Sequence, residues 1–114
     1  LVEAVAGLII SDPAVNPVWI AKWKQQPNDF IQQPFATLMS RDDVTDRLGE
    51  ITCPALVVHG TEDVSISMDK AEALAAGLSG PGPVVEVGGA HAANLTNPEP
   101  VNAAIREFLA GLPA

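Results

Sequence analysis

The chain has 114 residues, of which 47% are hydrophobic and 18% are charged, as is typical of a globular domain and not of a disordered segment. Its net charge of −8 argues against binding to nucleic acid, whose phosphates require clustered Lys and Arg, and argues equally against anionic membranes. The single Cys53 excludes an internal disulfide framework and fits a reducing compartment, so we expect a cytoplasmic protein.

The first expected element is a strand over residues 5–10. This stretch is short, apolar and rich in branched residues, and the breaker sequence SDP follows it at once. Short apolar runs of this kind are typical of strands that are buried on both faces of a parallel sheet.

A group of short helices is expected between residues 13 and 47, where Pro17, Pro27 and Pro34 divide the chain. Trp19 and Trp23 recur at helical spacing, which predicts an amphipathic helix over 18–26, and a second helical region follows over 30–39. Both tryptophans lie in this segment. Its aromatic content suits a lid or cap over a pocket.

The second half of the chain alternates between strands and helices. A strand buried on both faces is expected over 55–58, and a helix with Ser67 as its N-cap follows over 67–78. A short strand over 84–87 and a helix over 97–112 complete the pattern. This alternation predicts an α/β fold with a parallel sheet.

Three polar side chains follow the expected strands. Asp12 comes after the first, Asp63 after the second and His91 after the third. Ligands of parallel sheets bind beyond the carboxyl ends of the strands, and a catalytic imidazole requires a carboxylate that fixes its tautomer. We therefore expect Asp63 and His91 to lie side by side, with Asp12 as the reserve candidate for the acid.

Each of these residues also has a structural explanation. Asp63 could cap the turn before the next helix, and His91 could be a histidine with a purely structural hydrogen bond. The other histidine, His59, lies within an apolar strand and is expected to be a core or strand-end residue. Cys53 precedes Pro54 with no second histidine nearby, so we expect neither a cysteine nucleophile nor a metal site.

The stretches ITCPALVVHGTEDVSISMDKAEALAAGL and VVEVGGAHAANLTNPEPVNAAIREFLAGL resemble the C-terminal part of the α/β-hydrolase fold superfamily. The resemblance extends over nearly all of residues 1–114, with 13–47 in the place of the family's cap. It implies that Asp63 is the acid and His91 the histidine of a catalytic triad. Ala90 stands where many members have glycine, as in lactonase-like members.

The family's nucleophile motif, G-x-S-x-G, is absent from the sequence. We therefore expect the chain to be the C-terminal portion of a longer protein or the partner of another polypeptide. The strand expected over 5–10 would otherwise expose an apolar edge, which promotes aggregation. Use of a local serine is disfavoured, because no serine of the chain lies on a glycine-flanked strand-to-helix turn.

The resemblance implies a hydrolase of small esters or lactones, similar to enol-lactone hydrolases, which needs no cofactor. The apolar pocket of such an enzyme would be shaped here by Trp19, Trp23, Phe30 and Met39. The expected partners are a small-molecule substrate and the missing part of the fold. The alternative is a non-catalytic α/β module that binds a partner through its open sheet edge.

Overall fold

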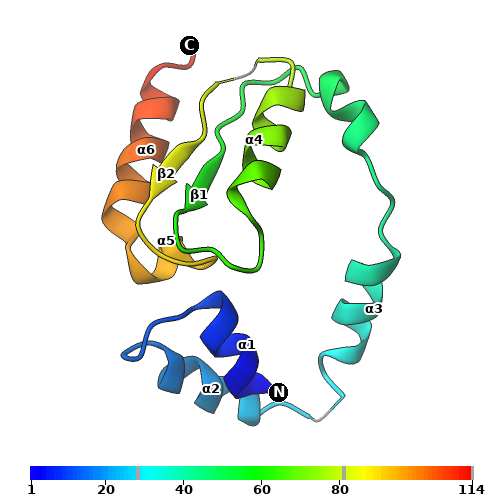
Figure 1. Cartoon of the computed structure of the whole chain (residues 1–114), viewed down its shortest axis with the longest axis vertical. Helices are drawn as coiled ribbons and strands as arrows, with labels where there is room; N and C mark the ends of the chain where they lie inside the picture. Colours follow the sequence, from blue (N-terminus) through cyan, green and yellow to red (C-terminus); the bar gives the residue numbers. More distant parts are fainter. Residues whose placement is uncertain (28, 81, 114) are drawn as a thin grey trace.

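The computed structural model describes residues 1–27, 29–80 and 82–113 and contains a small parallel sheet flanked by helices (Figure 1). The predicted cap segment is described except at position 28. In chain order the elements are α1 (Val2–Ile9), α2 (Asn16–Lys24), α3 (Gln32–Ser40), the 3₁₀ helix η1 (Thr45–Glu50), β1 (Val58–Gly60), α4 (Met68–Gly77), β2 (Val85–Val87), α5 (Ala93–Thr96) and α6 (Pro98–Ala110).

The sheet consists of β1 and β2, which run parallel with Val58 opposite Val85 and Gly60 opposite Val87. Helix α6 lies on one side of the strands and α4 on the other (Figure 1). Val87, the last residue of β2, packs with Ala93 of α5 and Val101 of α6 in a buried cluster. The sheet and its helices therefore hold the carboxyl ends of both strands in place.

The first predicted strand is wrong, because the residues assigned to it belong to helix α1. Helix α1 contains the strong helix formers Glu3, Ala4, Ala6 and Leu8, and periodicity alone cannot separate a short buried strand from a buried helix. Helix α1 buries Ala6 completely and ends at Ile9; Ser11, two residues further on, adopts a positive φ of 54°. The predicted apolar edge strand is thus absent, and the strand order contains β1 and β2 alone within the described ranges.

The second predicted strand exists, but it lies further along the chain, sharing only Val58 with the predicted range 55–58, and it is less buried than expected. Strand β1 begins at Val58, and residues 55–58 are half-buried instead of buried on both faces. A strand with a single neighbour has fewer side chains packed against it than a strand inside a large parallel sheet. The third predicted strand is confirmed as β2.

The predicted helices are confirmed, with small shifts at their ends. Helices α2 and α3 each have a proline near the N-terminus, where the missing N–H is tolerated. Ser67 occupies the N-cap position of α4, although its side chain makes no capping hydrogen bond. Helix α6 matches the expected C-terminal helix and buries Val101.

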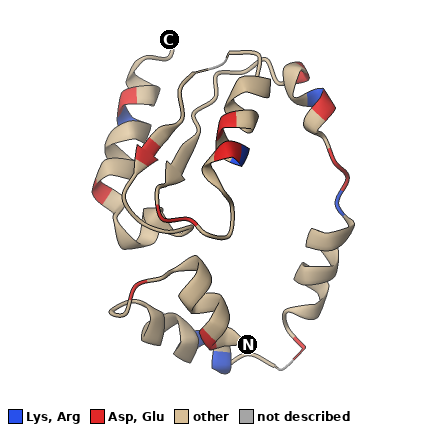
Figure 2. Ribbon diagram, viewed as in Figure 1, with Lys and Arg blue, Asp and Glu red and all other residues tan. Residues whose placement is uncertain are grey.

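Charged residues are spread over the whole molecule (Figure 2). Acidic side chains outnumber Lys and Arg by 14 to 6, and the basic residues lie on several elements and not on one face. None of the helices in the described part of the chain has the length and hydropathy required to cross a membrane.

Candidate active site

Asp63 lies in the turn that follows β1, and its side chain is only 2% exposed. Its Oδ1 atom accepts three hydrogen bonds: from the N–H of Ser65 at 2.9 Å, from the hydroxyl of Ser65 at 2.7 Å and from the N–H of Ile66 at 3.0 Å. The turn itself therefore fixes the orientation of the carboxylate. Asp63 thus caps this turn, which is its structural explanation from the sequence, and its other oxygen contacts His91.

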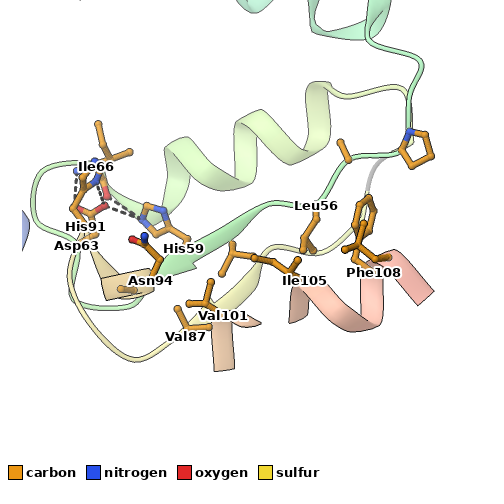
Figure 3. Close-up of a pocket in the computed structure, with 16 residues that line it drawn as sticks. Leu56, His59, Asp63, Ile66, Val87, His91, Asn94, Val101, Ile105 and Phe108 are labelled. Carbon is orange, nitrogen blue, oxygen red and sulfur yellow. Dashed lines mark hydrogen bonds and ion pairs between the residues drawn. The ribbon is translucent and has the colours of Figure 1, made fainter. Parts of the chain in front are cut away.

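His91 lies in the loop after β2, and its Nδ1 atom is 2.8 Å from Oδ2 of Asp63 (Figure 3). A carboxylate only accepts hydrogen bonds, so Nδ1 carries the donated proton and Nε2 of the neutral ring has a lone pair. The side chain of His91 is 46% exposed, and no hydrogen bond joins Nε2 to any residue in the described ranges. The two side chains thus meet as the sequence predicted.

The surroundings of Asp63 favour its charged form. Burial alone would raise the pKa of Asp63, but hydrogen bonds from Ile66, Ser65 and His91 outweigh burial and hold this pKa well below its usual range. Asp63 is therefore ionised at neutral pH, and the negative charge faces the imidazole of His91.

Backbone hydrogen bonds join the two loops that carry these side chains. The N–H of Thr61 donates to the carbonyl of Val87, and the N–H of Glu62 donates to the carbonyl of Gly89, each at 2.9 Å. These bonds continue the ladder between β1 and β2 beyond the strand ends. The separation between Asp63 and His91 is consequently set by main-chain geometry.

Gly60 permits this close approach. A Cβ atom at position 60 would overlap the carbonyl oxygens of Gly89 and Ala90, so a larger residue cannot be accommodated without movement of the His91 loop. Gly89 adopts a φ of 124°, a conformation that side-chain-bearing residues rarely adopt. The role of Gly60 depends on contacts between the two loops, which the sequence alone does not reveal.

Helix α1 also contacts the His91 loop. The carbonyl of Ile9 accepts a hydrogen bond of 2.9 Å from the N–H of Ala92. Asp12, the reserve candidate for the acid, follows α1 and not a strand. Its Oδ1 atom accepts hydrogen bonds from the N–H groups of Ala14 and Val15, and no hydrogen bond or ion pair joins it to His91 in the described part of the chain.

His59 lies closer to the site than the sequence suggested. It is the central residue of β1, its side chain is 10% exposed, and its Nε2 atom is 3.0 Å from the carbonyl oxygen of Ile66. The same nitrogen is 3.9 Å from Oδ2 of Asp63. In the sequence His59 lies two residues after Val57 in an apolar run, a pattern that gives no indication of this contact.

A cavity of about 550 Å³ opens beside these side chains (Figure 3). Its lining is polar at one end, where His59, Asp63, His91 and Asn94 gather, and apolar at the other, between β1 and α6. The apolar lining includes Leu56, Ile105, Phe108 and Leu109. The tryptophans and Met39 of the predicted cap are not among the residues that line it.

Among residues 1–27, 29–80 and 82–113, no three His, Cys, Asp or Glu side chains are grouped closely enough to hold a metal ion. A carboxylate at Nδ1 can orient an imidazole so that its Nε2 atom is able to accept a proton, and Asp63 and His91 have this geometry.

The chain is similar to a protein of Rhizobium rhizogenes named "Putative carbamate hydrolase RutD". The two are 39% identical over 67 residues, which is 59% of this chain and 26% of that protein. The matched stretch thus spans about a quarter of the relative's length. No protein-family model and no solved structure matches the chain. The similarity supports a relationship to hydrolases.

Proposed function

We propose that Asp63 and His91 are the acid and the histidine of a hydrolase that acts on ester or lactone bonds through a Ser-His-Asp triad. The observation that carries this proposal is the 2.8 Å contact between Oδ2 of Asp63 and Nδ1 of His91, made by a buried carboxylate and a half-exposed ring at the edge of a cavity. A ring held in this way can accept a proton at Nε2 while its developing positive charge faces an ionised carboxylate.

The roles of the two residues follow from their protonation states. The serine hydroxyl transfers its proton to Nε2 of His91 as its oxygen forms a bond to the carbonyl carbon. The imidazolium then returns this proton to the leaving-group oxygen as the ester bond breaks. Water repeats the cycle on the acyl-enzyme, and Asp63 remains ionised throughout.

The serine belongs, in this proposal, to a polypeptide segment with the G-x-S-x-G pattern, either in the same protein or in a companion chain. The pattern is absent from the 114 residues of this sequence. The loop of His91 leaves Nε2 without a hydrogen bond from the described residues, which is compatible with a hydroxyl from such a segment.

The substrate class proposed here is a small ester or lactone. The apolar end of the cavity suits a hydrocarbon acyl group. The name of the R. rhizogenes relative adds carbamates, whose carbonyl carbon undergoes the same attack, as a second class to assay.

The test uses the protein at its natural length, determined by intact mass, with p-nitrophenyl esters and a fluorophosphonate label. His91→Ala is expected to lower kcat by about 10⁶-fold, because the serine loses its base. Its melting temperature is expected to change little, because the ring is half-exposed. Asp63→Asn is expected to be severely impaired through the wrong imidazole tautomer.

Asp12→Asn is the matched control, because it removes a turn carboxylate that has no contact with His91. Near-normal turnover of His91→Ala would contradict the proposal. If Asp12→Asn lowered kcat more than Asp63→Asn, the acid of the triad would be Asp12 and not Asp63.

A non-catalytic interaction module is the second candidate. The observation in its favour is that several large apolar side chains are at least 40% exposed, among them Ile105 and Leu109 on α6. Absence of fluorophosphonate labelling on the protein and on every chain that copurifies with it would favour this candidate.

A further inference from the structure

His59 contacts the turn that holds Asp63, and among the described residues no hydrogen bond joins it to the half-exposed ring of His91. Its Nε2 atom lies 3.0 Å from the carbonyl oxygen of Ile66, and the N–H of the same residue donates to Oδ1 of Asp63. Ile66 is therefore held on both sides of its backbone, by His59 at the carbonyl and by Asp63 at the N–H.

The protonation of His59 follows from its partner. A backbone carbonyl only accepts hydrogen bonds, so the Nε2 atom of His59 carries a proton. That N–H is 3.9 Å from Oδ2 of Asp63, which is too long for a hydrogen bond. Oδ2 consequently remains available to His91, and the two imidazoles do not compete for it.

We propose that His59 is a positioning residue for the Asp63–His91 pair: through Ile66 it fixes the turn that aims the carboxylate at Nδ1 of His91. This inference rests on the proposed function in so far as the pair is catalytic. The low exposure of His59, 10% for the side chain, supports it, because a buried polar ring requires a partner and Ile66 provides one. A role in filling space alone would not depend on the Nε2–H group.

The test measures the imidazole tautomers of the full chain by long-range ¹⁵N–¹H NMR, detected through the carbon-bound ring protons. The chain has two histidines, so a variant of His59 leaves one ring in the spectrum. The spectra are recorded at about pH 8.5, two units above the ordinary histidine pKa of about 6.5. The expected wild-type forms are Nε2–H for His59 and Nδ1–H for His91.

His59→Phe keeps a ring in place and removes the donor. The ratio of Nδ1–H to Nε2–H tautomers of His91 is expected to fall about fivefold, the ratio that one ordinary hydrogen bond supports. His59→Gln, whose amide N–H can reach the same carbonyl, is expected to restore the ratio to within about twofold of wild type. Ala75→Gly, a buried position on α4, is the control for general destabilisation and is expected to leave the ratio unchanged.

An unchanged tautomer ratio in His59→Phe would overturn the inference. An Nδ1–H form of His59 in the wild-type spectrum would also overturn it, and that result does not depend on the folding of any variant. The NMR readout is independent of turnover. If His91→Ala keeps normal activity while the tautomers shift as expected, the proposed function fails and the positioning role of His59 remains.

Discussion

The two oxygens of Asp63 have different partners, and this division explains how a buried carboxylate can orient an imidazole. Three donors from Ser65 and Ile66 converge on Oδ1, whereas Oδ2 faces His91. The donors on Oδ1 stabilise the charged form against the cost of burial. An asparagine could keep its carbonyl oxygen on the turn, but its NH₂ group would then face Nδ1 of His91 and favour the opposite tautomer.

The lowered pKa of Asp63 predicts a specific dependence of stability on pH. Because the folded pKa lies below the unfolded value of about 3.9, the unfolded state binds the proton first as pH falls. The stability contributed by ionised Asp63 is therefore complete above about pH 4 and declines as pH falls towards the folded pKa. Wild type should exceed Asp63→Asn in melting temperature at pH 7, and the difference should shrink below about pH 4.

Thermal unfolding followed by circular dichroism across this pH range measures the difference. Asp12→Asn corrects for the loss of one negative charge, because Asp12 is also a turn carboxylate but has no imidazole partner. A difference between wild type and Asp63→Asn that stays constant through the acid range would contradict the assigned charge state of Asp63.

At the scale of elements, the site depends on how closely β1 approaches the loop after β2. Gly60→Ala would place a methyl group against the carbonyl oxygens of Gly89 and Ala90, and backbone atoms cannot move aside as a flexible side chain can. We expect a loss of about 1–3 kcal/mol in the free energy of unfolding, as in overpacked cores. The His91 Nδ1–H tautomer should be depleted as well, since the loop that carries the ring must shift.

Gly7→Ala is the matched control for this prediction, because an added Cβ at Gly7 has no atom within 4 Å. Gly7 lies inside α1, where alanine is expected to stabilise the helix by about 0.5–1 kcal/mol. Urea denaturation of the two variants provides the comparison. Equal or greater stability of Gly60→Ala would show that the two loops are not in the close contact described.

The sequence predicts those elements whose signals are local. Helix α6 combines a proline in its first turn with an apolar stripe, so both its existence and its position follow from the sequence. Helix α1 does not, because a short apolar run fits a helix and a strand equally well. Asp63 and His91 could be paired in advance, since parallel strand ends share one edge of a sheet.

Other parts of the site could not be predicted, because they depend on contacts between elements. The overlap that Gly60 avoids involves carbonyl oxygens of a loop that lies far along the chain. The contact of His59 with Ile66 arises from the path of the turn after β1, which strand periodicity does not determine. The bond between α1 and the His91 loop requires the correct assignment of residues 2–9 as helix.

At the scale of the whole molecule, the chain is more open than a closed monomer of its size. It exposes 8067 Å², whereas a monomer of 11.9 kDa is expected to expose about 6,000 Å². Its radius of gyration is 16.3 Å, and about 13 Å is expected for a compact chain of this length. The exposed surface includes large apolar side chains, among them Leu109 of α6, which is 57% exposed and lines the cavity.

This openness predicts that Leu109 contributes little to the folding of the chain itself. Leu109→Gln should leave the melting temperature almost unchanged and reduce the binding of an apolar fluorescent dye, because it replaces exposed apolar surface. Val101→Ala on the same helix is the comparison, since Val101 is 7% exposed and its truncation should cost about 2 kcal/mol. Differential scanning calorimetry and dye titration measure the two effects separately. If Leu109→Gln destabilised the chain as much as Val101→Ala, Leu109 would have to be packed against the rest of the chain in solution. The cavity between β1 and α6 would then be closed instead of open.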